Sequence, residues 1–218
     1  MIARLRTTLG RLRDDRRGLA LLEFAFYLPI FLTMCLMGTE LMNYIITRQR
    51  ISQIALHLSD NAARMGAGTM LQAKTISETD INDVLTGAGW QSGDLDLFKN
   101  GRVIISSVEP MARPNLTNRY KIGWQRCRGD KTTHVSGFGV AGQPSGTNMD
   151  GVGPAGMKVT APEDGGTMFV EVFYEYQPII KTSLSPSQTM TEVASMMIRD
   201  RRDMTQIYNV ENATRSTC

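Results

Sequence analysis

The feature that most constrains the fold of this chain is an apolar run of 19 residues, Leu19–Met37 (LALLEFAFYLPIFLTMCLM). Sixteen of these residues are apolar, and only Glu23, Pro29 and Thr33 interrupt the run. A helix of about 20 apolar residues is long enough to cross the hydrocarbon core of a bilayer. Core helices of soluble proteins rarely run this far without a polar face. The apolar run therefore predicts a membrane-spanning helix.

Positive charge is concentrated just before the apolar run. Residues 1–17 hold six arginines and two aspartates, a net +4, so the other 201 residues carry −1 of the total charge of +3. A basic flank favours the cytoplasmic side, which predicts export of the C-terminal part. Arg48 and Arg50 on the other flank reduce this bias without reversing it. The mild basicity of the chain thus gives no reason to expect a nucleic-acid partner.

A cleavable secretory signal would also begin with a basic segment and an apolar stretch. That stretch is usually about 7 to 15 residues long and ends at a small-residue cleavage site. Here apolar residues continue through residues 41–46, and the small residues at 62–67 come too late for the usual site. We therefore expect an anchor that stays in the membrane.

Glu23 lies inside the apolar run, where a charged side chain costs about 2.5 to 3.5 kcal/mol on insertion. One interpretation is that Glu23 marks the start of the span and reaches back to the cytoplasmic interface. The other is that the carboxylate has a function in the membrane. The residues around it favour the second interpretation.

The stretch Arg16–Pro29 reads RRGLALLEFAFYLP: a basic leader, a glycine, four apolar residues, a glutamate and an aromatic residue. It resembles the processing site of type IV prepilins and pseudopilins. The resemblance implies that a prepilin peptidase cuts between Gly18 and Leu19, which makes Glu23 the fifth residue of the mature chain. It also implies that the Glu23 carboxylate pairs with the Leu19 amine of a neighbouring subunit, which would offset the cost of its burial.

The pattern G-x-x-x-x-E-F-A-x-x-x-P, from Gly18 to Pro29, is more narrowly similar to the TadE-like proteins, which are minor pseudopilins of tight-adherence (type IVc) pili. The similarity covers about residues 16–66. The first mature residue, Leu19, departs from the phenylalanine common in type IV pilins. The resemblance implies several partners: other minor pseudopilins, the major pilin, the prepilin peptidase, the inner-membrane assembly platform and membrane lipid.

Helical periodicity continues beyond the apolar run as far as Met65. A helix over 19–65 would have 47 residues and a length of about 70 Å, against a hydrocarbon core of about 30 Å. We expect the membrane half to pack in a filament core and the outer half to contact a globular domain; a plain anchor with a coiled-coil neck is the alternative. Pro29 predicts a kink or a local loss of helix. The stripe expected to face the domain is Tyr44, Ile51, Ala55, Leu58, Ala62 and Met65.

Residues 67–218 predict an exported α+β domain that contains a small antiparallel sheet. A short helix is expected at 79–85, capped by Ser77 or Thr79. The nine glycines and three prolines of 137–166 predict a long loop, either a contact surface or a disordered insertion. Strands are expected at 102–108, 119–126 and 167–176. Residues 190–198 fit either a strand or a helix, and a strand is favoured.

No set of residues predicts catalysis, a metal site or a cofactor. Residues 137–142 (GFGVAG) match a dinucleotide-binding pattern, but Pro144 follows and no βαβ unit surrounds them. The two histidines, His57 and His134, lack cysteines at zinc-ligand spacing. Cys127 and Cys218 both lie on the exported side and could pair in an oxidising periplasm, or remain free or pair between molecules.

The expected organisation is a prepilin leader at 1–18, a transmembrane and extended helix at 19–66, and the exported domain at 67–218. We expect a single-pass inner-membrane protein with a cytoplasmic N-terminus and a periplasmic C-terminal domain, which also reaches the cell exterior in a pilus tip. Two alternatives are a signal-anchored periplasmic scaffold or binding protein that never enters a filament, and a membrane-tethered periplasmic enzyme.

Overall fold

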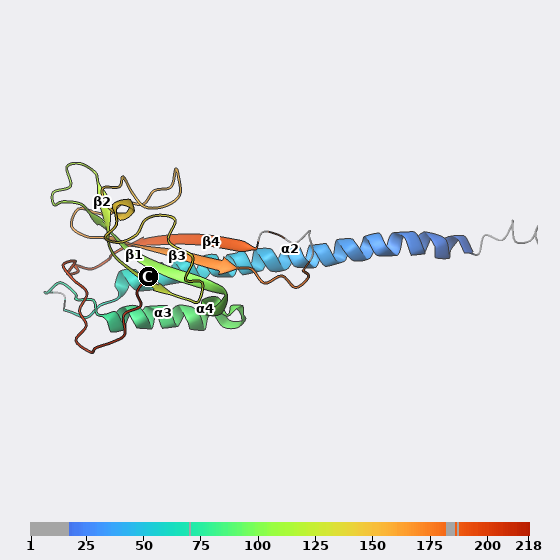
Figure 1. Cartoon of the computed structure of the whole chain (residues 1–218), viewed down its shortest axis with the longest axis horizontal. Helices are drawn as coiled ribbons and strands as arrows, with labels where there is room; N and C mark the ends of the chain where they lie inside the picture. Colours follow the sequence, from blue (N-terminus) through green and yellow to red (C-terminus); the bar gives the residue numbers. More distant parts are fainter. Residues whose placement is uncertain (1–17, 70, 182–185, 187) are drawn as a thin grey trace, which may run out of the picture. The chain divides into compact units, whose positions relative to one another are not determined.

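The computed structural model of the chain describes residues 18–69, 71–181, 186 and 188–218 (Figure 1). The predicted leader, apart from Gly18, lies outside the described residues. The chain divides into two compact units. We call Met1–Asn43 with Pro178–Pro186 the anchor unit, and Tyr44–Gln177 with Ser187–Cys218 the sheet domain.

Helix α2 (Leu19–Arg64) has 46 residues and continues without a break through Pro29. Two threonines in its apolar part bond back to the preceding turn: Thr33 Oγ1 donates to the Pro29 carbonyl at 2.7 Å, and Thr39 Oγ1 to the Cys35 carbonyl at 2.9 Å. Such bonds satisfy hydroxyl groups inside an apolar helix. The helix is continuous at Pro29, so the expected local loss of helix there is wrong, and a kink at Pro29 stays a prediction.

Among its described residues, the sheet domain contains four antiparallel strands in the order β2-β1-β3-β4. The central strand β1 is buried along its whole length, which explains why its sequence shows no alternation of apolar and polar residues. The expected α+β class is confirmed, and the ambiguous segment after residue 189 is a strand. The strands are β1 (Gly101–Pro110), β2 (Tyr120–Arg128), β3 (Thr167–Glu175) and β4 (Thr189–Met197).

The main core lies between one face of the sheet and two helices, the C-terminal part of α2 and α3 (Glu78–Ser92). Tyr44 of the predicted stripe is partly buried, and its five other members are all buried. Ser77 caps the start of α3: its side chain accepts from the Asp80 N–H while the Asp80 carboxylate accepts from the Ser77 N–H. This reciprocal cap satisfies two backbone donors at the helix start. A short helix, α4 (Leu97–Asn100), then leads into β1.

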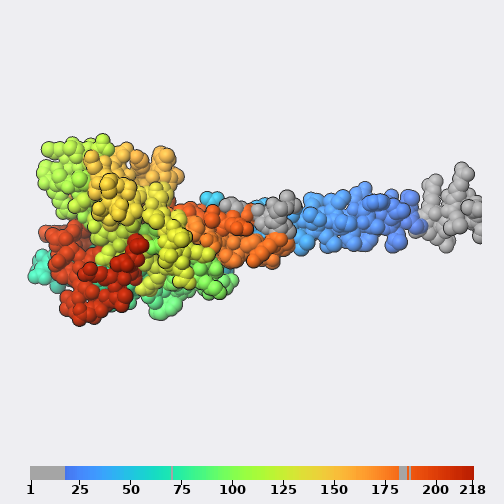
Figure 2. Space-filling view, in the orientation of Figure 1, coloured from blue at the N-terminus to red at the C-terminus, as the bar shows by residue number. Residues whose placement is uncertain are grey.

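The opposite face of the sheet is covered by the glycine-rich segment at 137–166, yellow to gold in Figure 2. Val152 and Ala161 of this segment pack in a second cluster with Phe169 of β3. A Cβ on Gly146 would lie 1.9 Å from the Val140 carbonyl oxygen, so this loop needs a glycine there. The segment is therefore an ordered cover for the sheet with little regular structure, apart from a 3₁₀ turn at Pro144–Gly146.

Candidate membrane and assembly site

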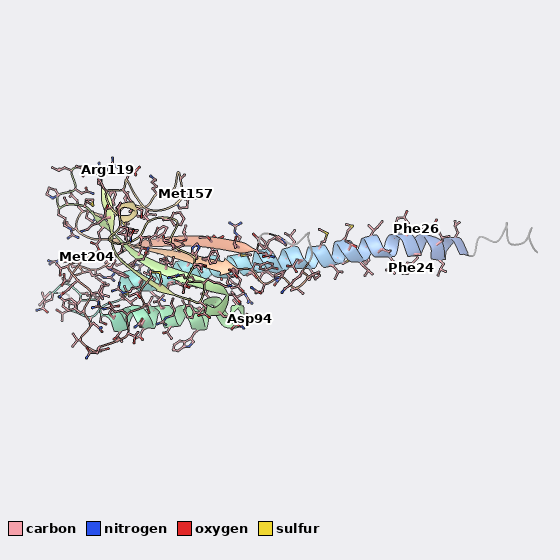
Figure 3. The ribbon with its side chains drawn as sticks, viewed as in Figure 1. Phe24, Phe26, Asp94, Arg119, Met157 and Met204 are labelled. Carbon is pink, nitrogen blue, oxygen red and sulfur yellow. A yellow bond between two sulfur atoms is a disulfide. The ribbon has the colours of Figure 1, made fainter. Side chains whose placement is uncertain are left out.

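The first half of α2 presents large apolar side chains around its whole circumference. Phe24 and Phe26 project from different sides of the helix (Figure 3). None of its most apolar 18-residue window is buried in the described structure. Soluble monomers rarely expose apolar patches larger than a few hundred Å². This surface therefore requires lipid or other protein as its surroundings. Its most exposed large side chains are Leu21, Phe26, Tyr27 and Met34.

The bond between Gly18 and Leu19 lies where α2 begins. Gly18 is exposed, and a Cβ built on it would meet no described atom within 4 Å. Packing within the described chain therefore does not require a glycine at this position. A requirement for glycine would have to come from a partner, such as a peptidase that binds this bond.

Glu23 is exposed in the second turn of α2 and forms no ion pair with another described residue. The expected pairing of Glu23 with an amine is intermolecular, so a single chain does not test it. Leu19 and Glu23 are four residues, or about 6 Å, apart along the axis of α2. An amine at Leu19 of one chain can therefore be level with Glu23 of another only if the two helices are displaced by about this distance.

Glu40 is the next acidic residue along α2 and is in a different environment. Only 5 % of its surface is exposed, and its Oε2 accepts a hydrogen bond from the Ile180 N–H at 3.0 Å. Ile180 belongs to the connection between β3 and β4, and both residues lie in the anchor unit. Sequence reasoning missed this contact, although Glu40 is the first charged residue after Glu23.

In the sheet domain, Cys127 of β2 is joined to Cys218 by a disulfide with an Sγ–Sγ distance of 2.08 Å. The Cys127 N–H also donates to the Ser216 carbonyl at 2.8 Å. Arg102 of β1 donates from its guanidinium to the Cys218 carbonyl at 3.0 Å. These contacts hold the C-terminal segment along the edge strand β2. The third cysteine, Cys35 in α2, is an exposed free thiol.

The structure brings together one group of serine, histidine and carboxylate that sequence reasoning did not expect. His134 Nε2 lies 2.8 Å from Oε1 of the buried Glu171, and the His134 ring stacks on Phe173. Ser136 Oγ donates to the other Glu171 oxygen at 2.8 Å. The hydroxyl bonds the carboxylate instead of the imidazole, which is not the arrangement of a nucleophile and its base. Among the described residues, no group of three His, Cys, Asp or Glu side chains could hold a metal ion.

Two ion pairs join the segment after β4 to other parts of the sheet domain. Arg199 pairs with Asp60 at 2.8 Å, and Asp200 pairs with Lys74 at 2.6 Å.

Arg202 has a structural role that the sequence did not indicate. Its NH2 group donates to the carbonyls of Ala62 at 3.0 Å and Met65 at 2.7 Å, at the end of α2. A cation at this end also interacts favourably with the helix dipole. Burial lowers the pKa of Arg202 to about 10, despite the opposing effect of Asp200.

A surface hollow of about 360 Å³ lies beside α3 in the sheet domain. Trp90 lines it and is 82 % exposed. Phe98 and Arg128 line it too, with the guanidinium carbon 5.8 Å from the ring centroid. An exposed tryptophan beside an arginine is typical of protein contact surfaces.

Comparison with protein-family models, curated proteins and solved structures finds no match to this chain. In the part of the chain that the structure describes, one helix is long and apolar enough to cross a membrane, and a small antiparallel sheet follows it. Single-pass anchors and N-terminal signal sequences share this length and composition.

Proposed function

We propose that this protein is a TadE-like minor pseudopilin of a tight-adherence pilus. The observation that carries the proposal is the position of Gly18, Leu19 and Glu23 at the start of α2, whose first half is apolar and exposed. A prepilin peptidase cuts after Gly18. Residues 19–218, which remain after the cut, carry a net charge of −1.

Glu23 sets the register of assembly in the membrane. The Leu19 amine of an incoming subunit pairs with the Glu23 carboxylate of a neighbour. When the two groups are level, the neighbouring helices are displaced by about 6 Å along their axes. An unpaired carboxylate in lipid is costly, so pairing favours this displacement over others. Once subunits pack, their helices cover one another's apolar surface.

The sheet domain supplies contacts outside the membrane. We assign the hollow beside Trp90 to contact with other minor pseudopilins or the major pilin, because exposed aromatic side chains contribute strongly at protein interfaces. In this account the protein acts in pilus assembly, initiation or tip formation. It is held in the inner membrane with its sheet domain in the periplasm until the assembly platform moves it into the fibre.

The proposal is tested by separating processing from assembly with Glu23→Gln and its matched control Glu23→Asp. Both variants should be cleaved like the wild type, because the carboxylate is not at the cut bond. Glu23→Gln should be largely lost from sheared fibres, whereas Glu23→Asp, which keeps the charge, should be retained better. Normal incorporation of Glu23→Gln would contradict the pairing. A wild-type chain that stays in the inner membrane and never enters fibres would favour a periplasmic scaffold.

A further inference from the structure

The outer boundary of the membrane can be located on α2 if the proposed span is correct. Residues 19–38 are 20 helical residues, which rise about 30 Å, the thickness of the hydrocarbon core. Glu40 follows two residues later and is the first charged side chain after Glu23. Glu40 therefore lies just outside the hydrocarbon core, at the level of the lipid headgroups.

The connection between β3 and β4 is attached to α2 at this level. The Ile180 N–H donates to Glu40 Oε2 at 3.0 Å, and Glu40 is almost fully buried. A hydrogen bond of this length places the backbone of Ile180 within a few ångströms of the carboxylate, hence near the same depth. The bond also compensates the Glu40 oxygen for the water that it loses on burial.

The chemistry of residues 178–181 (Pro-Ile-Ile-Lys) suits a lipid surface. The Ile179 side chain is 65 % exposed, and Lys181 is exposed. An apolar side chain beside a lysine is a favourable combination at the headgroup level, because the isoleucine enters the acyl boundary while the ammonium group reaches phosphate.

We propose that residues 178–181 form a second membrane contact, in which Ile179 inserts among the lipid headgroups at the outer end of α2. The contact rests on the proposed membrane span. The hydrogen bond from the Ile180 N–H to Glu40 holds residues 178–181 at this depth.

The test uses the full-length chain in vesicles of phosphatidylethanolamine and phosphatidylglycerol, with Cys35→Ala to remove the free thiol. A nitroxide label is placed at Ile179→Cys, at Phe26→Cys within the span, and at Leu116→Cys, an exposed position of the sheet domain. Collisions of each label with oxygen and with a water-soluble nickel complex report its depth. Ile179 should show a several-fold higher oxygen-to-nickel ratio than Leu116, and a lower ratio than Phe26.

Removal of the hydrogen bond between Glu40 and Ile180 provides a second measurement. Adding Glu40→Ala should shift the ratio at Ile179 toward that of Leu116 and leave Phe26 unchanged. A water-like ratio at Ile179 with Phe26 deep in lipid would overturn this inference alone. A water-like ratio at Phe26 would overturn the membrane span itself. Protection of Ile179 from both reagents would show protein as its partner and also overturn the lipid contact.

Discussion

At the residue scale, the sheet domain contains a buried ion pair between α3 and β2. Arg126 Nε donates to Glu78 Oε2 at 2.9 Å, and NH2 donates to Oε1, so the pair is bidentate. The Glu78 side chain is 1 % exposed, and Arg215 lies 3.6 Å away as a secondary partner. A charge that loses its partner in such a site cannot regain its hydration.

Arg126→Met should therefore lower the free energy of unfolding by about 3 to 5 kcal/mol, because it removes both bidentate bonds and leaves the buried Glu78 with only the longer, exposed contact to Arg215. Chemical denaturation of the full chain in detergent measures this loss. The control is Asp94→Asn, which breaks the exposed pair with Arg50 and should cost less than about 1 kcal/mol. Equal losses in the two variants would contradict the assignment of Glu78 as a buried, paired charge.

Glu109 of β1 is a buried carboxylate in a different electrostatic situation. Burial raises its pKa, opposed by a hydrogen bond from Ser107 and by the charges of Lys121 and Arg113. The Ser107 hydroxyl donates to Oε1 at 3.0 Å. Gly123 of β2 leaves room for this carboxylate, since a Cβ there would lie 2.0 Å from Oε1. The folded protein thus holds a proton on Glu109 more tightly than the unfolded chain does.

The raised pKa of Glu109 determines the direction in which the free energy of unfolding changes with pH. The contribution of Glu109 to the free energy of unfolding is largest below the ordinary glutamate pKa of about 4.3, and it falls as pH rises through the folded-state pKa. Glu109→Gln should remove this part of the pH dependence and raise stability at neutral pH relative to the wild type. Denaturation midpoints measured from about pH 4 to 8 test this. An unchanged slope in Glu109→Gln would count against it.

At the element scale, α2 changes its surroundings along its length. Its first half is exposed and apolar on all sides, whereas residues 44–64 bury one stripe in the main core of the sheet domain. Leu58 is 1 % exposed on this stripe, and Leu56, two residues earlier, is 51 % exposed. The two leucines lie on different faces of one helix and so form a matched pair.

Leu58→Ala should destabilise the sheet domain by about 2 to 5 kcal/mol, since it removes buried methyl groups and leaves a cavity. Leu56→Ala should change stability by no more than about 0.5 kcal/mol, as is usual for exposed positions. Thermal or chemical unfolding of the two variants in detergent gives the comparison. A larger loss of stability in Leu56→Ala than in Leu58→Ala would contradict the assignment of the Leu58 face of α2 as the face that packs against the sheet.

At the scale of the whole molecule, local patterns in the sequence predicted most elements because their signals are local. The stripe from Tyr44 to Met65 follows helical spacing, and the cap at Ser77 follows from side-chain chemistry. The order of the strands is not local, because β3 pairs with β1 across 56 intervening residues that include β2 and the glycine-rich segment. The same limit explains the contacts that were missed: Glu40 with Ile180, and His134 with Glu171, join segments that no spacing rule connects.

The charge of the whole molecule is unevenly distributed along the chain. Six of the arginines lie in residues 1–17, and the chain from Leu19 onward carries a net −1. In the proposed function, the basic segment orients the span and is then removed. The proposed function therefore depends on a peptidase that separates these two parts at one bond.

The most direct test is the intact mass and N-terminal sequence of the protein purified from cells with and without the prepilin peptidase. With the peptidase, the purified chain should begin at Leu19; without it, residues 1–18 should remain. Gly18→Tyr should block the cut, while Gly10→Tyr, within the leader, should not. A wild-type chain that still begins at Met1 in the presence of the peptidase, or one cut near Ala63, would contradict the account.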